Sequence, residues 1–386
     1  MRMRMPPLLR VRGAIADAIW RFSASAIVLL AALCLGDIST LSAQPQPQRF
    51  PDDFDQLFAA VELGPDRVLL TEKGEQRPFV VEWRSGARSS IGSVGKGPRE
   101  FLGPRRLYAL TANHVVIEDP YRYTYYPWVD GRVQEGLNLR VVRQGYSQQI
   151  LAGADTVGRF LFASAHRLGR TPGLRHRYNA KELVAVIGTR GHARLDTVTT
   201  LRGSFRAETS VYRMNVGRRL EFQHYSLLVT EEQALLFPDG WLAVLRKEPY
   251  RVEWRSPDGA WRRGAVVSDT VIPVTLEEKR YALFRHANAL QRLSFKVEEF
   301  PNWPPTMPPF PLDALLPLPD GRLAVRRTAT AKDHTEWIDI FDRTGKRVDR
   351  WRLPRDHQLI GIGAQWLYLT SRDDDDLYSL WRMRWP

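Results

Sequence analysis

The sequence of 386 residues contains a single cysteine, Cys34, and no Asn-x-Ser/Thr sequence for N-glycosylation. Because Cys34 lies in the N-terminal segment, the remainder of the chain can form no disulfide and has no thiol nucleophile. The Gly-x-Ser-x-Gly motif of serine hydrolases is also absent. The fold must therefore depend on a hydrophobic core, for which 44% hydrophobic residues suffice.

Lysine is rare: only 8 of the 56 basic residues are lysine, as a GC-rich genome produces. The formal net charge is +13, but the arginines are spread along the whole chain. A nucleic-acid-binding protein concentrates such residues on one face or motif, so we expect no nucleic-acid partner. The eight histidines occur singly, without the spacing of a zinc motif, although a propeller enzyme can collect ligands from several repeats.

A long hydrophobic run is also missing, since the longest, Ala26–Leu35, is too short to cross a bilayer comfortably. It follows five arginines and precedes Ser42-Ala43, which predicts a signal peptide over residues 1–43 rather than an uncleaved anchor. Lipidation at Cys34 is disfavoured because Leu33 replaces the small residue required before it. We expect export to the periplasm or outside of a bacterial cell, with no membrane span after cleavage and a linker over residues 44–52.

Strand-and-turn units recur through the rest of the chain. Leu315–Asp349 contains Pro-Asp-Gly before one strand and Arg-Thr-Gly after another, and PDGWLAV at Pro238–Val244 repeats the first phrase. The pentapeptide VEWRS occurs at both Val81–Ser85 and Val252–Ser256. Four-stranded units repeating at roughly 40 to 50 residues indicate a β-propeller.

The spacing of the repeats sets the expected number of blades. Two intervals between second strands are nearly doubled, and the capping box Thr275–Glu278 predicts a helix over Thr275–Leu293 in one of them. Leu201–Thr230 lacks a strand-turn-strand pattern, so we predict an extended loop in the other. The expected fold is an all-β six-bladed propeller of four-stranded antiparallel blades over residues 53–386, with a helical and Pro-rich insertion at about 275–311; seven blades is the alternative. The predicted second strands begin near Val68, His114, Arg159, Trp241, Arg322 and Trp366.

Three segments carry a resemblance to a known family. IGSVGKGPREFLG at Ile91–Gly103, the Pro273–Glu278 entry to a helix and the Pro-rich Pro301–Pro311 resemble an exported bacterial family of six-bladed, NHL-repeat-like β-propellers. The resemblance spans nearly all of the chain after the signal peptide and implies the fold, but not a function. The sequence departs from the family in Lys96 and Ala324. We also expect the Phe50–Leu63 segment to pair with the last unit, because ring closure removes exposed edges.

Aromatic residues supply the candidate binding site. Asp119–Trp128 (DPYRYTYYPW) and Trp303 could contact a peptide, glycan or protein, and the residues that we select are Tyr121, Tyr126, Trp128 and Trp303. The alternative is structural: the tyrosines fill the wedge between blades, and Trp303 plugs the channel or packs under the helix.

Two other motifs have plain structural interpretations. Gly92, Gly95 and Gly97 resemble a phosphate-binding loop, but a strand rather than a helix follows, which favours a connection between blades with Phe101 buried. Asp373–Asp376 lacks the spacing of a calcium loop and fits a solvated hairpin tip.

Two hypotheses of function remain. The first is a non-catalytic binding or scaffold module, monomeric and without a cofactor, which presents loops to an unknown protein, peptide or glycan. The second is a lactonase-like hydrolase or lyase with calcium or zinc in the central channel. Convergence of carboxylate, Asn or His side chains from several blades would distinguish them.

Overall fold

The computed structural model describes residues 46–385 except 122–123, 139–145, 167–181, 190–195, 204–208, 216–217, 225–226, 229, 270, 286–295, 300–302, 374 and 376. The predicted signal peptide lies outside the described residues. No helix of the described part is long and apolar enough to span a membrane.

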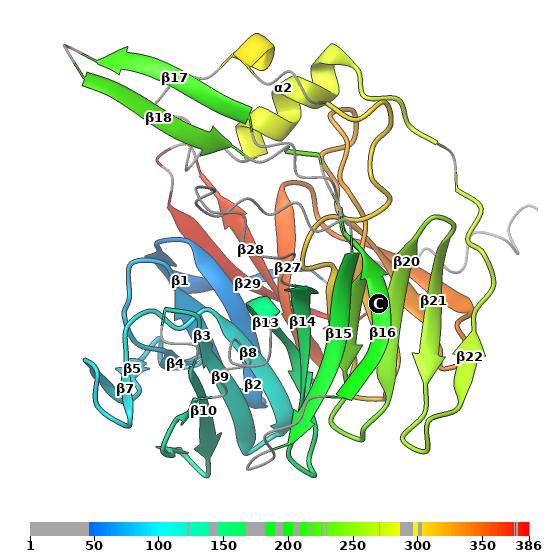
Figure 1. Cartoon of the computed structure of the whole chain (residues 1–386). Helices are drawn as coiled ribbons and strands as arrows, with labels where there is room; N and C mark the ends of the chain where they lie inside the picture. Colours follow the sequence, from blue (N-terminus) through cyan, green and yellow to red (C-terminus); the bar gives the residue numbers. More distant parts are fainter. Residues whose placement is uncertain are drawn as a thin grey trace, which may run out of the picture. The chain divides into compact units, whose positions relative to one another are not determined.

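The described chain is mostly β-strand, in small antiparallel sheets with a propeller-like arrangement (Figure 1). Four sheets have the size of one blade. The first is β2–β3–β4–β5, with bounds Leu57–Gly64, Arg67–Glu72, Phe79–Glu82 and Arg88–Ser90. The second is β8–β9–β10–β11, at Arg106–Thr111, His114–Asp119, Thr124–Val129 and Arg132–Val133, with β12 (Leu137–Asn138) beside β10. The third is β23–β24–β25–β26, at Leu315–Pro317, Leu323–Arg326, Trp337–Phe341 and Arg347–Arg352. The fourth joins β27, β28 and β29 (His357–Ile362, Trp366–Arg372, Tyr378–Arg384) to β1 (Gln48–Phe54).

The fifth large sheet has eight strands, where the prediction has two separate four-stranded blades. One half is β13–β14–β15–β16 (Tyr146–Ala154, Arg159–His166, Glu182–Thr189, Asp196–Arg202); the other is β19–β20–β21–β22 (Gln233–Leu236, Leu242–Lys247, Tyr250–Arg255, Trp261–Arg263). A single parallel pair, Gly153 with Leu236, joins them. Gly153 has a φ of +125°, and a Cβ there would lie 2.4 Å from the Leu236 carbonyl oxygen, so only glycine permits this approach. Among the described residues, four separate blade-sized sheets are therefore found in place of the predicted six.

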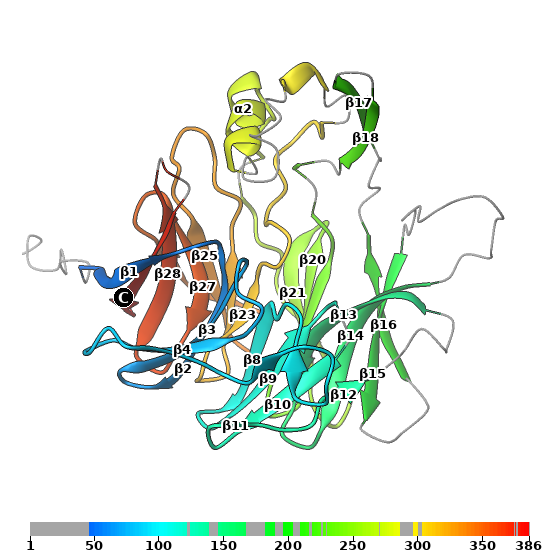
Figure 2. The ribbon, with the colours of Figure 1, turned by 90° about the vertical axis from the view of Figure 1, so that its left-hand side faces the viewer.

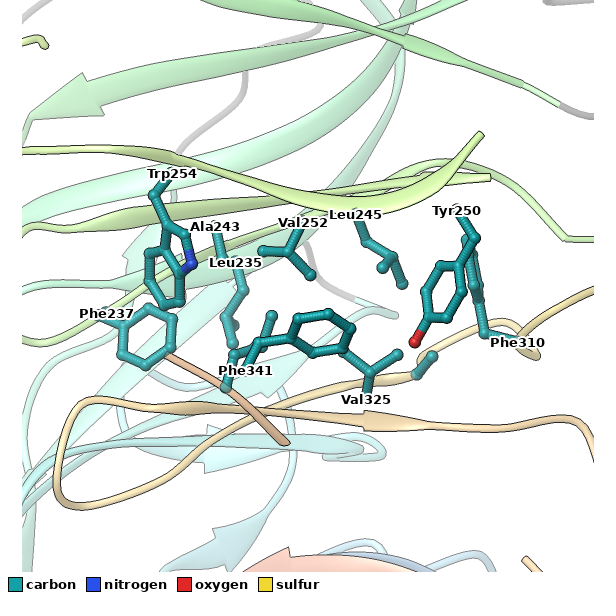
Figure 3. Close-up of a cluster of buried hydrophobic side chains, with 12 residues drawn as sticks. Leu235, Phe237, Ala243, Leu245, Tyr250, Val252, Trp254, Phe310, Val325 and Phe341 are labelled. Atoms are coloured by element: carbon teal, nitrogen blue, oxygen red, sulfur yellow. The ribbon is translucent and has the colours of Figure 1, made fainter. Parts of the chain in front are cut away.

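The first strands of the blade-like units contact one another in a closed cycle: β2 with β8, then β13, β19, β23, β27 and back to β2. Buried hydrophobic clusters fill the spaces between successive units. In one of them, Trp254 and Tyr250 of β21 face Phe341 of β25 and Phe310 (Figure 3). This packing, rather than any cross-link, holds the units together.

Strand β1 joins the beginning of the described chain to its end. It pairs with β29, placing Gln48 opposite Arg382 and Phe54 opposite Tyr378. The prediction that this segment pairs with the last unit is confirmed for its first part, while Leu57–Gly64 forms β2 instead. Because β1 begins at Gln48, residues 48–52 belong to a sheet although they were predicted as linker.

The insertion contains a helix, as predicted. Helix α2 spans Leu276–Arg285, and the amide of Glu278 donates to Thr275 Oγ1 at 3.3 Å, one half of the capping box. The Glu278 carboxylate accepts from the amide of Ala331 instead. The Pro-rich segment runs beside the lead-in to the helix, where Pro273 bridges Thr306. The predicted helix of the insertion is confirmed as far as Arg285. Residues 286–293 lie outside the described residues.

The predicted extended loop at 201–230 is wrong. It contains a hairpin of β17 (Thr209–Asn215) and β18 (Arg218–His224), which forms a sheet of its own. In both Figure 1 and Figure 2 this hairpin lies on the same side of the large sheets as α2. The sequence RRLEFQH of β18 does alternate, with Leu220 and Phe222 between polar residues, whereas TSVYRMN of β17 is less regular, so the strand signal is confined to part of the hairpin.

The glycine motif is a connection, as predicted. Strands β6 (Ser93–Val94) and β7 (Glu100–Phe101) pair in parallel, and Phe101 is fully buried against Tyr126 with ring centroids 4.6 Å apart. Gly92 has a φ of +69°, and a Cβ there would meet the Phe101 ring at 2.8 Å. Space for that ring therefore requires glycine.

Candidate functional site

A cavity of about 220 Å³ lies between β16 of one half of the eight-stranded sheet and β20 and β21 of the other half. We name it the arginine cavity. Four guanidinium groups and three carboxylates line it, together with one threonine: Arg202, Arg246, Arg251, Arg263, Glu232, Glu248, Glu253 and Thr200. This concentration of arginine in one concave surface suits an anionic ligand.

Strand register brings the charged groups together. Arg246 near the end of β20 pairs in register with Arg251 at the start of β21, and Glu253 lies opposite Arg263 of β22. Glu232 lies just before β19, and its carboxylate accepts a hydrogen bond from the backbone amide of Arg202 at 3.0 Å. The cavity is thus built from four strands and one strand entry.

Arg246 is the fixed centre of the cavity. Its Nε donates to Glu253 at 2.9 Å and its Nη1 to Glu232 at 2.7 Å, while Thr199 and the Thr200 carbonyl accept further bonds. Its side chain is only 17% exposed. With four of its five N–H donors occupied, Arg246 positions the other groups rather than serving as a main contact for a ligand.

The Arg246–Glu253 ion pair keeps its charges over a wide pH range. Burial alone would raise the pKa of Glu253, but hydrogen bonds from Arg246 and Arg251 outweigh it and the pKa is lowered. Burial likewise opposes the charge on Arg246, yet its bonds to Glu232 and Glu253 raise its pKa. This central pair is therefore ionised at neutral pH.

Arg263 and Arg202 are the exposed cations of the cavity. The Arg263 side chain is 75% exposed and contacts Glu253 at 3.4 Å, on an oxygen that Arg251 already binds at 2.9 Å. Arg202 is also exposed. An incoming anion can therefore bind these two guanidinium groups without breaking the buried ion pairs.

A second cavity of about 160 Å³ adjoins the first and shares Arg246, Glu253 and Arg263 with it. We name it the Trp261 groove; its remaining lining residues are Thr199, Trp261 and Arg262. The indole of Trp261 is 45% exposed. An aromatic face thus borders the charged cavity.

A different polar cluster crosses the cycle of first strands. Arg106 of β8 donates to Asp313, just before β23, at 2.6 Å and lies 3.7 Å from Glu118 of β9. Tyr108 donates to the Leu151 carbonyl oxygen, and the Leu151 amide donates to Glu118. We name Arg106, Tyr108, Glu118 and Asp313 the Arg106 cluster. Side chains from opposite units therefore converge at this position.

Burial raises the pKa of Glu118 to about 7, although Arg106 and the Leu151 amide oppose that shift. Burial and the neighbouring Glu118 charge also raise the pKa of Tyr108. A glutamate that titrates near neutrality can act as a general acid or base.

The Arg106 cluster does not fit calcium or zinc. The guanidinium of Arg106 already stands between the carboxylates of Glu118 and Asp313, where a cation would sit. Within the described residues, no group of three or more His, Cys, Asp or Glu has a metal-binding arrangement.

The structure separates the four predicted binding residues. Tyr126 is fully buried, with its hydroxyl on the Glu100 carbonyl, and Trp128 is 4% exposed in the same hydrophobic cluster. Both are core residues, because the sheet that carries them is packed on both faces. Their prediction as binding residues is therefore wrong. The structural interpretation of this aromatic stretch holds for them.

Tyr121 and Trp303 have different surroundings. Tyr121 is 63% exposed, lies over Gly103 and receives a hydrogen bond from Arg105 at 3.2 Å. Trp303 donates to the Val297 carbonyl, in the 3-10 turn η3 (Val297–Glu299), and its ring lies 5.8 Å from the Lys279 ammonium of α2. Tyr121 is accessible, whereas Trp303 packs with the helical insertion.

Comparison with known proteins gives similarities to solved structures only. No known family matches the sequence, and no curated protein matches it. An exported protein of Bacteroides fragilis is 13% identical, with a TM-score of 0.45 over 89% of this chain and 94% of the other. A gluconolactonase of Xanthomonas campestris is 10% identical, with a TM-score of 0.44 over 89% and 92%. Regucalcin of Agrobacterium tumefaciens, a calcium-binding protein, is 9% identical, with a TM-score of 0.38 over 89% and 96%.

Proposed function

We propose that this protein is an exported, non-catalytic binding or scaffold module, periplasmic or extracellular and monomeric, which binds an anionic glycan, peptide or protein surface at the arginine cavity. The observation that carries the proposal is the excess of guanidinium groups in a concave surface whose buried members are locked in place. Tyr121, exposed elsewhere on the protein, is a second proposed contact.

We further propose a ring of six blades, with the halves of the eight-stranded sheet counted as two. Two observations support this count. The six first strands contact one another in a closed cycle. A separate hydrophobic cluster also packs between the halves, with Leu161 and Leu201 on one side and Leu236 and Val244 on the other, as between other neighbouring units.

Binding at this cavity uses preorganised charge. Arg246 and Arg251 are already ordered by carboxylates, so an anion that binds Arg202 and Arg263 orders only two exposed side chains. Preorganisation lowers the entropic cost of binding, and salt weakens the attraction at these exposed groups.

Citrate, a small multivalent carboxylate, tests the proposal. We expect calorimetric titration of the full chain at low salt to detect binding, and the double variant Arg202→Ala with Arg263→Ala to weaken it by about tenfold or more. Arg355→Ala is the matched control, because that side chain is 70% exposed and lies outside the cavity. Equal citrate affinity in all three proteins would contradict the proposal.

A second candidate function is an acid–base hydrolase or lyase, lactonase-like, at the Arg106 cluster. The raised pKa of Glu118 and its convergence with Tyr108 and Arg106 favour it. In that role Glu118 would transfer the proton and Arg106 would stabilise an anionic intermediate, with no step through a metal. Turnover of a lactone panel that disappears in Glu118→Gln would favour this candidate over the binding module.

The raised pKa of Glu118 also predicts how the unfolding free energy depends on pH, whichever function is correct. Its pKa rises from 4.5 to about 7 on folding, so the unfolded chain releases this proton first and stability falls as pH rises between these values. Glu118→Gln removes that penalty. We expect its unfolding free energy, relative to wild type, to increase by about 2 kcal/mol between pH 5 and pH 8 in urea titrations.

Glu135→Gln, a change at an exposed glutamate, supplies the baseline for this comparison. A difference between wild type and Glu118→Gln that is the same at both pH values would show that Glu118 titrates normally, and the enzyme candidate would lose its support.

A further inference from the structure

We infer that the arginine cavity and the Trp261 groove together bind a chain of carboxylated sugars. This inference rests on the proposed function and specifies its ligand. It combines three features of the surface: an exposed indole, exposed guanidinium groups and an exposed carboxylate, placed side by side on β16 and β20–β22.

Trp261 supplies a flat apolar contact. It is the first residue of β22, the last strand of its half of the sheet, and is 45% exposed. The guanidinium of its neighbour Arg262 lies 5.0 Å from the centroid of the Trp241 ring, and the guanidinium of Arg343 lies at the same distance. Arg262 is therefore held against Trp241 and not against Trp261. The exposed indole can therefore pack against the C–H face of a sugar ring, with its polar edge still in water.

The charges in the cavity select the polar groups of the ligand. Arg263 and Arg202 are exposed donors suited to a carboxylate. Glu248 is an exposed acceptor in the same cavity, suited to a hydroxyl group. A ligand that alternates carboxylates with hydroxyl donors matches both, as each unit of an acidic sugar chain does.

Densely charged anions fit less well. Glu232, Glu248 and Glu253 bring three carboxylates to the cavity, which repel closely spaced phosphates or sulfates. Glu253 is already bound by Arg246, Arg251 and Arg263, so most of its acceptor sites are occupied. A ligand chain with widely spaced charges therefore suits the full set of lining residues better than a densely charged anion does.

The size of the surface favours an extended ligand. The two cavities measure about 220 and 160 Å³, and each is smaller than the ~300–1,000 Å³ of a pocket that encloses a drug-sized molecule. Because they share Arg246, Glu253 and Arg263, they are adjacent. A chain with one sugar at Trp261 and the next carboxylate at Arg263 spans both.

The test uses tetrasaccharides of galacturonate, mannuronate and hyaluronan, titrated calorimetrically into the full chain. We expect at least one to bind, and its methyl ester to bind about tenfold more weakly, because the ester removes the charge that Arg263 recognises. Trp261→Ala should weaken sugar binding about fivefold or more while leaving citrate binding unchanged, since citrate has no face to stack.

The outcomes separate the inference from the proposed function. Citrate binding that depends on Arg263, with no binding of any tetrasaccharide, overturns the sugar inference and leaves the anion site standing. Tighter, Trp261-dependent binding of an octaglutamate peptide also overturns it, in favour of an acidic peptide. If neither citrate nor any sugar binds, the proposed anion-binding function of the arginine cavity is wrong as well.

Discussion

A chain that begins at Asp55 is expected to lose its cooperative thermal transition, because it lacks β1. The deletion removes Phe50 and Phe54, both buried against Trp366 and Tyr368, and uncovers the edge of β29 along its pairing with β1. Each buried phenylalanine contributes about 3–5 kcal/mol. The two together approach the whole net stability of about 5–15 kcal/mol of a folded protein.

Polar contacts add to the effect of this deletion. Gln48 accepts a hydrogen bond from Arg382 at 2.9 Å, and the Arg382 guanidinium lies 4.3 and 4.5 Å from the rings of Trp366 and Trp83. Without β1, Arg382 loses the partner that helps to hold it between these rings. The exposed edge of β29 also becomes a site for pairing with other chains, so aggregation should accompany unfolding.

Circular dichroism melting of three chains decides this prediction. A chain that begins at Gln46 is the matched control, since it retains all of β1, and should melt as the full chain does. Phe50→Ala in that chain should lower the unfolding free energy by about 3 kcal/mol. If the chain from Asp55 melted with the same midpoint and steepness as the control, β1 would not close the structure.

Much of the fold is predictable from the sequence because its signals are local. Each predicted second strand is present and begins within one residue of the expected position, for example β9 at His114 and β28 at Trp366. These strands are short apolar runs beside Gly and Asp turns, and such runs form strands wherever a neighbouring sheet covers them. Helix α2 was found by its cap at Thr275 for the same reason.

The errors concern contacts that no local pattern specifies. The junction of the eight-stranded sheet depends on Gly153 meeting Leu236, more than 80 residues later. Tyr126 and Trp128 were predicted as binding residues because they are aromatic, and the sequence does not show that their strand is buried on both faces. The aromatic residues of that strand pack in the core and do not form a binding surface.

The arginine cavity was missed for a similar reason. Its basic residues are Arg202 on β16, Arg246 and Arg251 on β20 and β21, and Arg263 on β22, single residues in a sequence with many arginines. Only their register in adjacent strands collects them. One signal was available: Arg246 and Arg251 flank a short Lys-Glu-Pro-Tyr hairpin, which places both side chains at one end of the sheet.

Asp339 provides the second large expected effect. It is fully buried on β25 and accepts hydrogen bonds from Tyr250 at 2.9 Å and from Arg350 at 2.6 Å, with Arg327 and Arg347 also in contact. Asp339→Ala leaves these groups without their central partner. Removing one side of a buried ion pair costs about 3–5 kcal/mol, because the remaining charge stays desolvated.

The consequences of Asp339→Ala should extend to the segment before α2. Asp269 shares Arg327, Arg347 and Arg350 with Asp339, so three like charges would remain around a single carboxylate. Their repulsion should loosen the connection after β22 as well as the packing of Tyr250 against Phe341. We therefore expect faster amide exchange over residues 264–269 and a melting temperature lower by about 10 °C.

Asp339→Asn and Asp320→Ala separate charge from packing in this prediction. Asparagine keeps an acceptor for Tyr250 but loses the charge, so its loss should be smaller, about 2 kcal/mol. Asp320 pairs with Arg322 on the surface, where the side chains are 43% and 33% exposed, and its alanine variant should lose less than about 1 kcal/mol. Equal losses for Asp339→Ala and Asp320→Ala in urea unfolding would mean that the buried carboxylate does not hold the arginines and Tyr250 together.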